Sequence, residues 1–312
     1  MEIYEIHHPM KDPNFTDPVV LAMGFFDGLH RGHQKVIETA KQIARKKGVK
    51  LAVLTYDHHP SIVYEQLDAR DQKYLTLNDH KMDLLSDMGV EIVYQVSYTY
   101  AFQAQSPQEF VDNYLCQFNA VTVVAGFDHT YGSGQRANMH LLPQYVQDRF
   151  EVVEVPSYDL DGQKVSSTRV RRNLDDGHIA TVNELLGRPF VTSGTVVHGF
   201  ARGRELGFPT ANIEHDEKQW LPTIGIYIVR MKIGDQWYGG MASIGRNVTF
   251  GDSFKVTVEI NLFDFDQNIY GEVVDIEWLY WTRGEVKFDG VEALIEQLKA
   301  DQKTAEHFLS NL

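Results

Sequence analysis

The sequence predicts a parallel α/β half, followed by an antiparallel β half that forms a barrel or sandwich and ends in one helix. In the first half, short apolar runs alternate with segments of helical spacing, as in βαβ units. From Val191 the segments are short, rich in Thr, Val and Tyr, and no helical pattern interrupts them before Val291. Because 312 residues exceed the usual size of one domain, we expect two domains, residues 1–185 and 186–312.

In the first half, apolar runs predict five strands, at residues 19–23, 51–56, 91–96, 121–125 and 150–155. Helical spacing predicts four helices, one beginning close to His30 and the others at residues 78–88, 107–118 and 140–147. Asn78 and Ser106 are placed to cap the second and third of these helices. Ligands of parallel sheets bind at the carboxyl ends of strands, where Asp27, Asp57 and Asp128 stand in this chain.

In the second half, candidate strands lie at residues 192–197, 225–233, 236–242, 255–262 and 273–280. Several of them alternate polar and apolar residues, as residues 256–261 do. Residues 291–309 then place their apolar side chains broadly on one side of a closing helix.

The composition argues against several classes of protein. A net charge of −14 disfavours nucleic acid or an anionic membrane as the main partner. No apolar run is long enough to span a membrane, and the first residues do not resemble a signal peptide. The single cysteine, Cys116, cannot form an internal disulfide and is expected to pack as a small apolar side chain, so we expect a cytoplasmic protein. No feature favours a particular oligomeric state.

A phosphate site is predicted where the first strand turns into the first helix. Gly24 and Gly28 allow a tight turn, and Gly32 allows a ligand to approach the backbone. His30 and His33 are three residues apart, so they share one face of the helix start, where free N–H groups favour an anion. The alternative is two surface histidines at an ordinary helix start.

A second anion-binding motif covers residues 165–171. Ser167 and Thr168 offer hydroxyl groups, and Arg171 could reach the same phosphates across one helical turn. The alternative is a Ser/Thr helix cap followed by exposed arginines. Asp128, in a glycine-bounded loop, could accept a hydrogen bond from a sugar hydroxyl or could merely form a turn.

Residues 57–59 read Asp-His-His, which could suggest a transition-metal site. Adjacent residues do not converge on one ion without a special backbone, so metal binding by His58 and His59 is the weaker interpretation. Asp57 is a candidate contact to a Mg²⁺–phosphate group.

A glycine-spaced segment opens the second half. Gly199, Gly203 and Gly207 allow a loop whose N–H groups surround a polyphosphate. Thr210 and Asn212 are hard oxygen ligands suited to Mg²⁺ on ATP. The chain contains no GxxxxGK[ST] motif, so this is not a P-loop kinase.

Together these motifs resemble the bacterial bifunctional riboflavin kinase/FAD synthetase family over the whole chain. The matching elements are the HxGH of residues 30–33, the Ser-Ser-Thr-x-x-Arg of residues 166–171, the Gly-Phe-Pro-Thr-Ala-Asn of residues 207–212 and residues 258–271. The resemblance implies an α/β nucleotidyltransferase domain of Rossmann-like fold and an all-β riboflavin kinase barrel with a C-terminal helix. It implies that ATP phosphorylates riboflavin to FMN, and that a second ATP adenylylates FMN to FAD with release of pyrophosphate. Mg²⁺ would accompany ATP, and no permanently bound cofactor is implied.

The resemblance also assigns expected roles to residues. His30 and His33 would stabilise charge on the α-phosphate, and Glu259 would be the general base for riboflavin. Further contacts to ATP or its phosphates would come from Gly24, Phe26, Asp27, Gly28, Gly32, Ser167, Thr168, Arg171, Gly199, Gly203, Gly207, Thr210 and Asn212. Contacts to the flavin would come from Asp57, Asp128, Arg283 and Phe288. The chain departs from the family pattern at His58, His129, Arg246 and Val248.

Three rival functions remain open. One is an enzyme with a single live site, in which case the kinase is the expected survivor. Another is a flavin-binding regulator without turnover, although such a binder would not need both phosphate sites. The third is a pantetheine- or glycerol-type nucleotidyltransferase, which the second domain disfavours.

Overall fold

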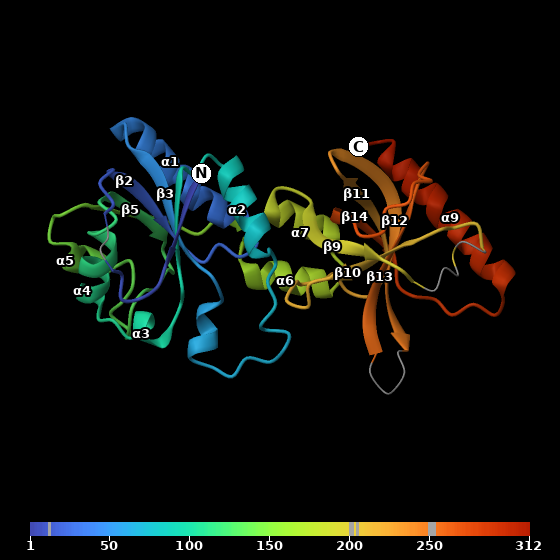
Figure 1. Cartoon of the computed structure of the whole chain (residues 1–312), viewed down its shortest axis with the longest axis horizontal. Coiled ribbons are helices and arrows are strands. Elements are labelled where there is room, and N and C mark those ends of the chain that lie inside the picture. Colours follow the sequence, from blue (N-terminus) through green and yellow to red (C-terminus); the bar gives the residue numbers. More distant parts are fainter. Residues whose placement is uncertain (12–13, 200–202, 204–205, 249–253) are drawn as a thin grey trace. The chain divides into compact units, whose positions relative to one another are not determined.

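The structure is a computed structural model that describes residues 1–11, 14–199, 203, 206–248 and 254–312. The side chains of residues 247–248 and 254–255 lie outside the described part, and Val248 is among them. The chain divides into two compact units, Met1–Ser167 and Thr168–Leu312 (Figure 1). The boundary predicted at residue 185 remains a prediction.

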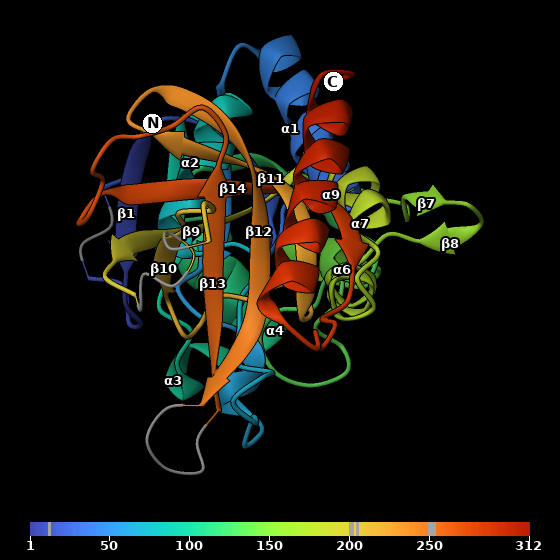
Figure 2. The ribbon, with the colours of Figure 1, turned by 90° about the vertical axis from the view of Figure 1, so that its right-hand side faces the viewer.

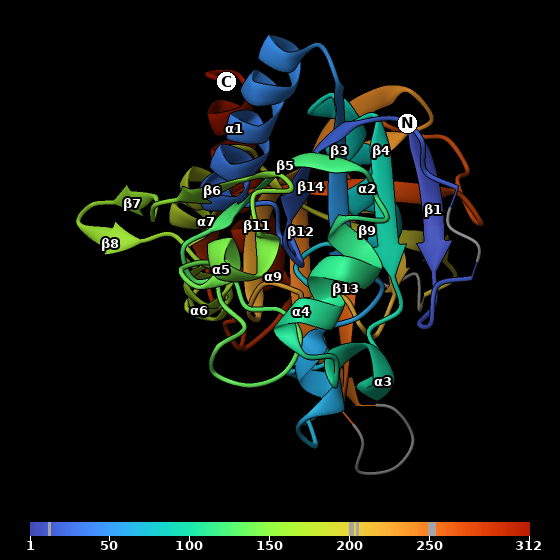
Figure 3. The ribbon, with the colours of Figure 1, turned by 90° about the vertical axis from the view of Figure 1, so that its left-hand side faces the viewer.

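The first unit contains a six-stranded, all-parallel sheet in the order β1-β4-β3-β2-β5-β6 (Figure 3). Its strands are β1 (Glu2–Ile6), β2 (Val19–Met23), β3 (Lys50–Tyr56), β4 (Ile92–Val96), β5 (Ala120–Gly126) and β6 (Glu151–Val155). The predicted parallel α/β fold of the first half is therefore confirmed.

Both faces of this sheet are buried. Along β2, Val19, Leu21 and Met23 belong to one apolar cluster, whereas Val20 and Ala22 belong to another. Successive side chains of a strand point to opposite faces, so a fully apolar run supplies both clusters at once. The predicted packing of Cys116 is also observed, because it lies against the first cluster.

Helices cover the two faces of the sheet. The helical segments of the first unit are α1 (Arg31–Lys47), the 3₁₀ turn η1 (Pro60–Val63), α2 (Asn78–Asp87), α3 (Tyr100–Gln103), α4 (Pro107–Phe110), the π-helical turn η2 (Val111–Leu115) and α5 (Leu142–Val146). α1 and α2 pack on one cluster, and α3, α4 and η2 pack on the other. A short hairpin, β7 (Asp159–Leu160) with β8 (Gln163–Lys164), lies near the end of the unit.

The two predicted caps had different outcomes. Ser106 caps α4 in a capping box with Glu109, as predicted. Asn78 does not cap α2, because the cap position is Leu77 and Asn78 is the first helical residue. The Asn78 side chain instead exchanges hydrogen bonds with Gln95 on β4.

The second unit is a closed antiparallel barrel in the order β10-β13-β12-β11-β14-β9, which confirms the predicted barrel (Figure 2). Its strands are β9 (Phe190–Val197), β10 (Ala211–His215), β11 (Gly225–Ile233), β12 (Gln236–Val248), β13 (Phe254–Leu262) and β14 (Val273–Arg283). The helices of this unit are α6 (Ser167–Asp175), α7 (Ile179–Leu186) and the closing helix α9 (Val291–Leu309). Figure 2 shows α9 alongside β12, where Leu298 and Ala305 join an apolar cluster with Met241.

Candidate functional site

The first site is built on the turn that joins β2 to α1. Phe26, Gly28 and Leu29 all adopt left-handed backbone conformations, with φ of 58°, 81° and 41°. Phe26 and Leu29 are almost fully buried, so packing holds these two non-glycine residues in an unfavourable conformation. At Gly24 an added Cβ would lie 2.7 Å from the Phe26 ring, so only glycine leaves room for it. Such strain is typical of functional turns.

This turn delivers His30 and His33 to one place, as predicted. His30 occupies the cap position of α1, and the two imidazole rings stack with their centroids 3.7 Å apart. The backbone N–H of His33 donates to Nδ1 of His30 over 3.3 Å. Because an N–H group can only donate, Nδ1 of His30 must carry a lone pair, and the proton of its neutral ring lies on Nε2. His30 is thus set to donate a hydrogen bond through Nε2.

His33 is held neutral. Burial, followed by the nearby His30, Lys164 and Lys81, holds its pKa well below the ordinary value. Its Nδ1 is buried and has no hydrogen-bond partner among the described residues. The Phe26 ring packs edge-on against it, with centroids 5.3 Å apart. A neutral imidazole donates hydrogen bonds without bringing a charge of its own to the site.

The barrel contains a cavity of about 470 Å³, and the first unit contains one of about 440 Å³. The cavity in the first unit brings together seven of the predicted residues: Gly24, Phe26, His30, Gly32, His33, Asp128 and Ser167. It is also lined by Phe25, His59, His129 and Lys164, none of which the sequence assigns to a phosphate site.

Asp27 and Gly28 do not line this cavity. The buried Asp27 carboxylate accepts hydrogen bonds from the N–H groups of Leu75 and Thr76, at 3.2 and 3.1 Å. The Ser167 hydroxyl donates to the Asp27 backbone carbonyl over 2.9 Å. Asp27 therefore ties the turn to the segment before α2, and it places Ser167 at the cavity.

The acidic residues expected near the flavin take different positions. Asp57 is exposed and lies outside the cavity lining, where it pairs with Nδ1 of His58 at 2.7 Å and accepts from the Tyr98 N–H. Asp128 lines the cavity and pairs with Lys164, whose Nζ lies 4.7 Å from the centroid of the Phe127 ring. Lys164 thus brings a cationic side chain, paired with Asp128, to the cavity, and no sequence motif predicts it.

His129, one of the departures from the family pattern, is also in this lining. Burial lowers its pKa to about 4, and its Nε2 has no hydrogen-bond partner among the described residues. This imidazole is therefore neutral over the ordinary pH range.

The rest of the predicted anion-binding motif begins the second unit. Thr168 and Arg171 lie on α6, directly after Ser167. The Arg171 guanidinium lies over the Trp220 ring, 5.5 Å from its centroid.

The second site lies where β10 and β13 pair in the barrel. Thr210 precedes β10, and its hydroxyl donates to the Glu259 carboxylate over 3.4 Å. Asn212 stands opposite Glu259 in the ladder. Gly199 packs against the Asn212 side-chain amide. A Cβ added at Gly199 would lie only 2.2 Å from Nδ2 of Asn212. The predicted residues Thr210, Asn212, Glu259 and Gly199 are thus brought together.

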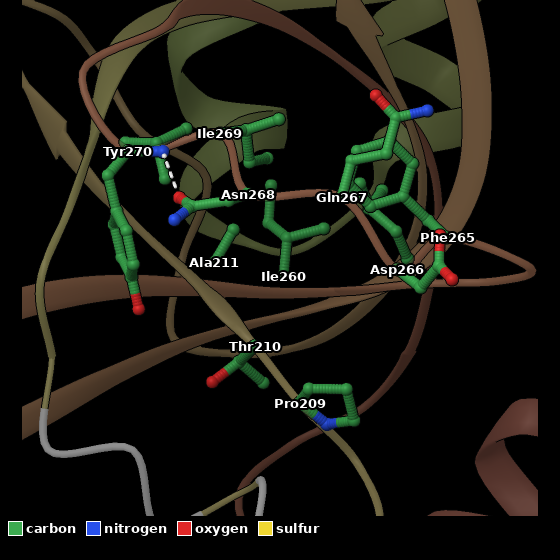
Figure 4. Close-up of a pocket in the computed structure, with 12 residues that line it drawn as sticks. Pro209, Thr210, Ala211, Ile260, Phe265, Asp266, Gln267, Asn268, Ile269 and Tyr270 are labelled. Carbon is green, nitrogen blue, oxygen red and sulfur yellow. Dashed lines mark hydrogen bonds between the residues drawn. The ribbon is translucent and has the colours of Figure 1, made fainter.

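Two cavities meet at Thr210. The larger, about 470 Å³, is lined by Thr210 and by residues 265–270, as Figure 4 shows. The smaller, about 230 Å³, is lined by Thr210 and Glu259, by the predicted Gly203, and by a mostly apolar wall of Leu206, Phe208, Ile226, Met241 and Ala242. Thr210 therefore lines both cavities, and the Glu259 carboxylate lies beside it in the smaller one.

The remaining predicted residues of the barrel lie at its margins. Arg283 forms an ion pair of 2.6 Å with Asp301, which lines the smaller cavity, so Arg283 adjoins that cavity through Asp301. Gly207 has a left-handed φ of 83°, and Phe288 is half-buried. Neither lines one of the two cavities. Arg246 is exposed on β12.

The oxygen donors of the barrel site fit Mg²⁺ bound together with ATP. Within the described ranges, no group of three or more His, Cys, Asp or Glu side chains could hold a metal ion. Magnesium commonly takes only one or two protein oxygens and completes its shell with phosphates and water. Thr210, Asn212 and Glu259 offer hard oxygens of that kind.

No helix in the described part of the chain is long and apolar enough to cross a membrane.

Comparisons with known proteins cover both units. The family described as FAD synthetase matches residues 12–169, and the family described as riboflavin kinase matches residues 186–309. A bifunctional riboflavin kinase/FMN adenylyltransferase of Listeria monocytogenes is 44% identical over 313 residues, covering 100% of this chain and 99% of the relative. The protein of the same description from Bacillus subtilis is 38% identical over 308 residues, covering 98% of this chain and 96% of the relative.

Among solved structures, one described as a macrolide-efflux protein from Streptococcus pneumoniae matches with a TM-score of 0.92 and 37% sequence identity. The match covers 98% of this chain and 99% of that chain. This likeness extends the agreement in fold to the whole chain, while both family matches and both curated relatives agree on flavin chemistry.

Proposed function

The chain belongs to the bifunctional riboflavin kinase/FMN adenylyltransferase family, and on that premise we propose which residues perform its two reactions. The chain is a riboflavin kinase and an FMN adenylyltransferase. We assign FMN adenylylation to the cavity at His30 and His33, and riboflavin phosphorylation to the paired cavities at Thr210 and Glu259. The observation that carries the assignment is that each unit holds its own pair of groups suited to phosphate chemistry.

In the first unit, a phosphate oxygen of FMN attacks the α-phosphorus of ATP, and the bond to pyrophosphate breaks. Negative charge develops on the α-phosphate oxygens in the transition state, where preorganised donors are most effective. Nε2–H of His30 and the neutral ring of His33 provide such donors beside the α1 N-terminus. Gly32 allows the close approach, because an added Cβ there would lie 3.1 Å from the His30 ring. No base is needed, since the attacking phosphate is already ionised.

In the barrel, the 5′-hydroxyl of riboflavin attacks the γ-phosphorus of ATP, and ADP leaves. This hydroxyl must lose its proton, and the Glu259 carboxylate is the acceptor we assign. The apolar wall around Phe208 and Met241 suits the flavin ring, so we assign riboflavin to the smaller cavity. ATP then occupies the larger cavity, and the two substrates meet beside Thr210, which lines both.

Thr210 and Asn212 are the side chains that would hold Mg²⁺ with ATP, and the ion would neutralise charge on the transferred phosphate. Arg283 and Asp301 would frame the flavin end of the smaller cavity from β14 and α9. We also propose a reducing, cytoplasmic location for the protein, because Cys116 is the single cysteine and no internal disulfide can form.

Product analysis tests the proposal directly. The protein is incubated with riboflavin and Mg²⁺-ATP, and flavins are separated by chromatography over time. We expect FMN to appear first and FAD to follow. FMN alone would support an enzyme with one live site, and retention of riboflavin without any product would support a regulator.

A further inference from the structure

A lysine is buried behind the first cavity. Lys81 lies on α2 and is only 4% exposed. Its Nζ donates hydrogen bonds to the Tyr56 carbonyl over 3.0 Å and to Thr55 Oγ1 over 3.4 Å. The charges that favour its ammonium form are those of Asp27 and Asp57, and among the described residues Lys81 forms no ion pair within 4.0 Å.

Burial of an ammonium group without a close carboxylate is costly. The Asp27 carboxylate is engaged by the N–H groups of Leu75 and Thr76, and Asp57 pairs with His58. Packing alone would be served better by an apolar residue, as it is at the neighbouring Met82 and Leu85. Groups of this kind gather at functional sites.

Lys81 connects to the cavity through Phe25. The ammonium lies 5.1 Å from the centroid of the Phe25 ring, and Phe25 lines the cavity. Thr55 Oγ1, which accepts from Lys81, in turn donates to the Phe25 carbonyl over 3.0 Å. Lys81 also acts on His33, whose pKa it helps to lower. The Lys81 ammonium therefore contacts Phe25 in the cavity wall and helps to lower the pKa of His33 in the same cavity.

We propose that Lys81 is a positioning residue of the adenylyl-transfer site, which orients the Phe25 wall and supplies a buried positive charge that the polyphosphate of the nucleotide balances. This inference rests on the proposed function of the first unit. A fixed charge buried behind the cavity acts on phosphate without reorganisation during the reaction.

The charge of Lys81 depends on pH. Burial lowers its pKa to about 8, against the opposing effect of Asp27 and Asp57. Among the other titratable groups on this side of the sheet, His33 is neutral, and burial raises the pKa of Tyr74, which lies beside Phe25. The ammonium is therefore present at pH 7 and is lost as the pH rises through about 8, so adenylyl transfer should decline there.

The test compares Lys81→Met with a matched control in the full chain. Lys41 on α1 also donates to a backbone carbonyl, that of Met88, over 2.6 Å, and it does not line the cavity. Lys81→Met should lower kcat/KM for FAD formation from FMN at least about tenfold, because a preorganised charge is lost. Lys41→Met should leave it within about twofold. FMN formation by the same molecules reports whether the chain is folded.

Two further outcomes decide the matter. In the wild-type protein, kcat/KM for FAD formation should fall above about pH 8, and Lys81→Met should lack that alkaline decline. The inference is overturned if Lys81→Met keeps FAD formation near the wild-type rate, if it loses both activities equally, or if it retains the alkaline decline. If the wild-type protein makes no FAD at all, the function assigned to the first unit fails instead.

Discussion

At the scale of single residues, the two sites differ in whether the nucleophile must lose a proton. The nucleophile in the first unit is an ionised phosphate, so the side chains there need only stabilise negative charge. His30 and His33 are neutral donors, and neither has to accept a proton. The nucleophile in the barrel is a hydroxyl group, and Glu259 is the carboxylate within reach of the shared Thr210. Substitutions at the two sites should therefore separate the two reactions.

Replacement of both histidines should abolish FAD formation alone. His30→Ala with His33→Ala removes the donors at the α-phosphate, and loss of one such donor typically costs about 100- to 1,000-fold in rate. FMN formation should persist, because the barrel holds its own site. The control replaces the exposed His140 and His307 by alanine. Equal loss of both activities in the first variant would contradict the assignment of two independent sites.

Glu259→Gln should impair the kinase reaction alone. The amide keeps the shape of the side chain but cannot accept the hydroxyl proton, and general bases typically contribute about 100- to 10,000-fold. We expect kcat for FMN formation to fall at least about 100-fold, with riboflavin affinity little changed and FAD formation from supplied FMN intact. Glu277→Gln, which removes a half-buried carboxylate paired with Arg230, is the control. Near-normal turnover in Glu259→Gln would mean that another group activates the hydroxyl.

His129 should make the protein sensitive to acid. Its folded pKa is about 4, below the value of about 6.5 for an unfolded chain. The unfolded state therefore binds more protons between these pH values, so stability falls as the pH drops from 6.5 towards 4, by up to about 3 kcal/mol for this group. His129→Phe removes this contribution. Urea unfolding at pH 6.5 and 4.5 should show a smaller loss of stability in His129→Phe than in the wild-type protein; an equal loss would refute this explanation.

At the scale of elements, the turn between β2 and α1 is the most constrained part of the first site. Gly28 has a φ of +81°, and an added Cβ would lie 2.9 Å from Leu75. Gly48, at the other end of α1, has a φ of +69° but open space around it. Gly48→Ala should thus cost about 1 kcal/mol from backbone strain alone. Gly28→Ala should cost more in thermal unfolding and should also lower FAD formation, since it displaces the strand–turn–helix unit; identical effects of the two would contradict this.

Strong apolar runs made most strands predictable from the sequence. Elements with a weak apolar pattern were not predicted, or their type was not. β2 is apolar along its length, and β3 and β5 are mostly apolar, because both faces of the sheet are buried. β1 escapes prediction because it is an edge strand in which only Ile6 is buried. The predicted helix at residues 107–118 is instead the short α4 followed by a π-helical turn, a distinction that residue spacing does not encode.

The candidate sites were predictable where function needs a local motif. A spacing of three residues is enough to bring His30 and His33 together at a helix start. Likewise, Thr210 and Asn212 belong to one short segment. Lys81 carries no such signal, because a lysine on a helix is normally solvent-exposed and only the tertiary structure buries it. The resemblance assigns Asp27 a contact to ATP, but no motif indicates that its carboxylate accepts hydrogen bonds from the N–H groups of Leu75 and Thr76.

At the scale of the whole molecule, the contacts of α6 and α7 indicate that these helices belong to the barrel unit. Asn183 on α7 donates to the Trp278 carbonyl and accepts from the Phe190 N–H, and the Leu174 carbonyl on α6 accepts from the Thr223 N–H. Trp278 is fully buried, so removal of these helices would strip contacts from β14 and β9.

Two fragments test this organisation. Residues 186–312 contain every barrel strand and both cavities that we assign to riboflavin phosphorylation, so this fragment should fold and phosphorylate riboflavin without making FAD. Residues 168–312 add α6 and α7 and should melt at a higher temperature, because about 1 kcal/mol is typical for each buried hydrogen bond and the helices also cover apolar surface. Circular dichroism, limited proteolysis and FMN formation measure both fragments. Equal melting temperatures would mean that the two helices contribute nothing to the barrel, and an unfolded shorter fragment would move the functional boundary from residue 185 towards residue 168.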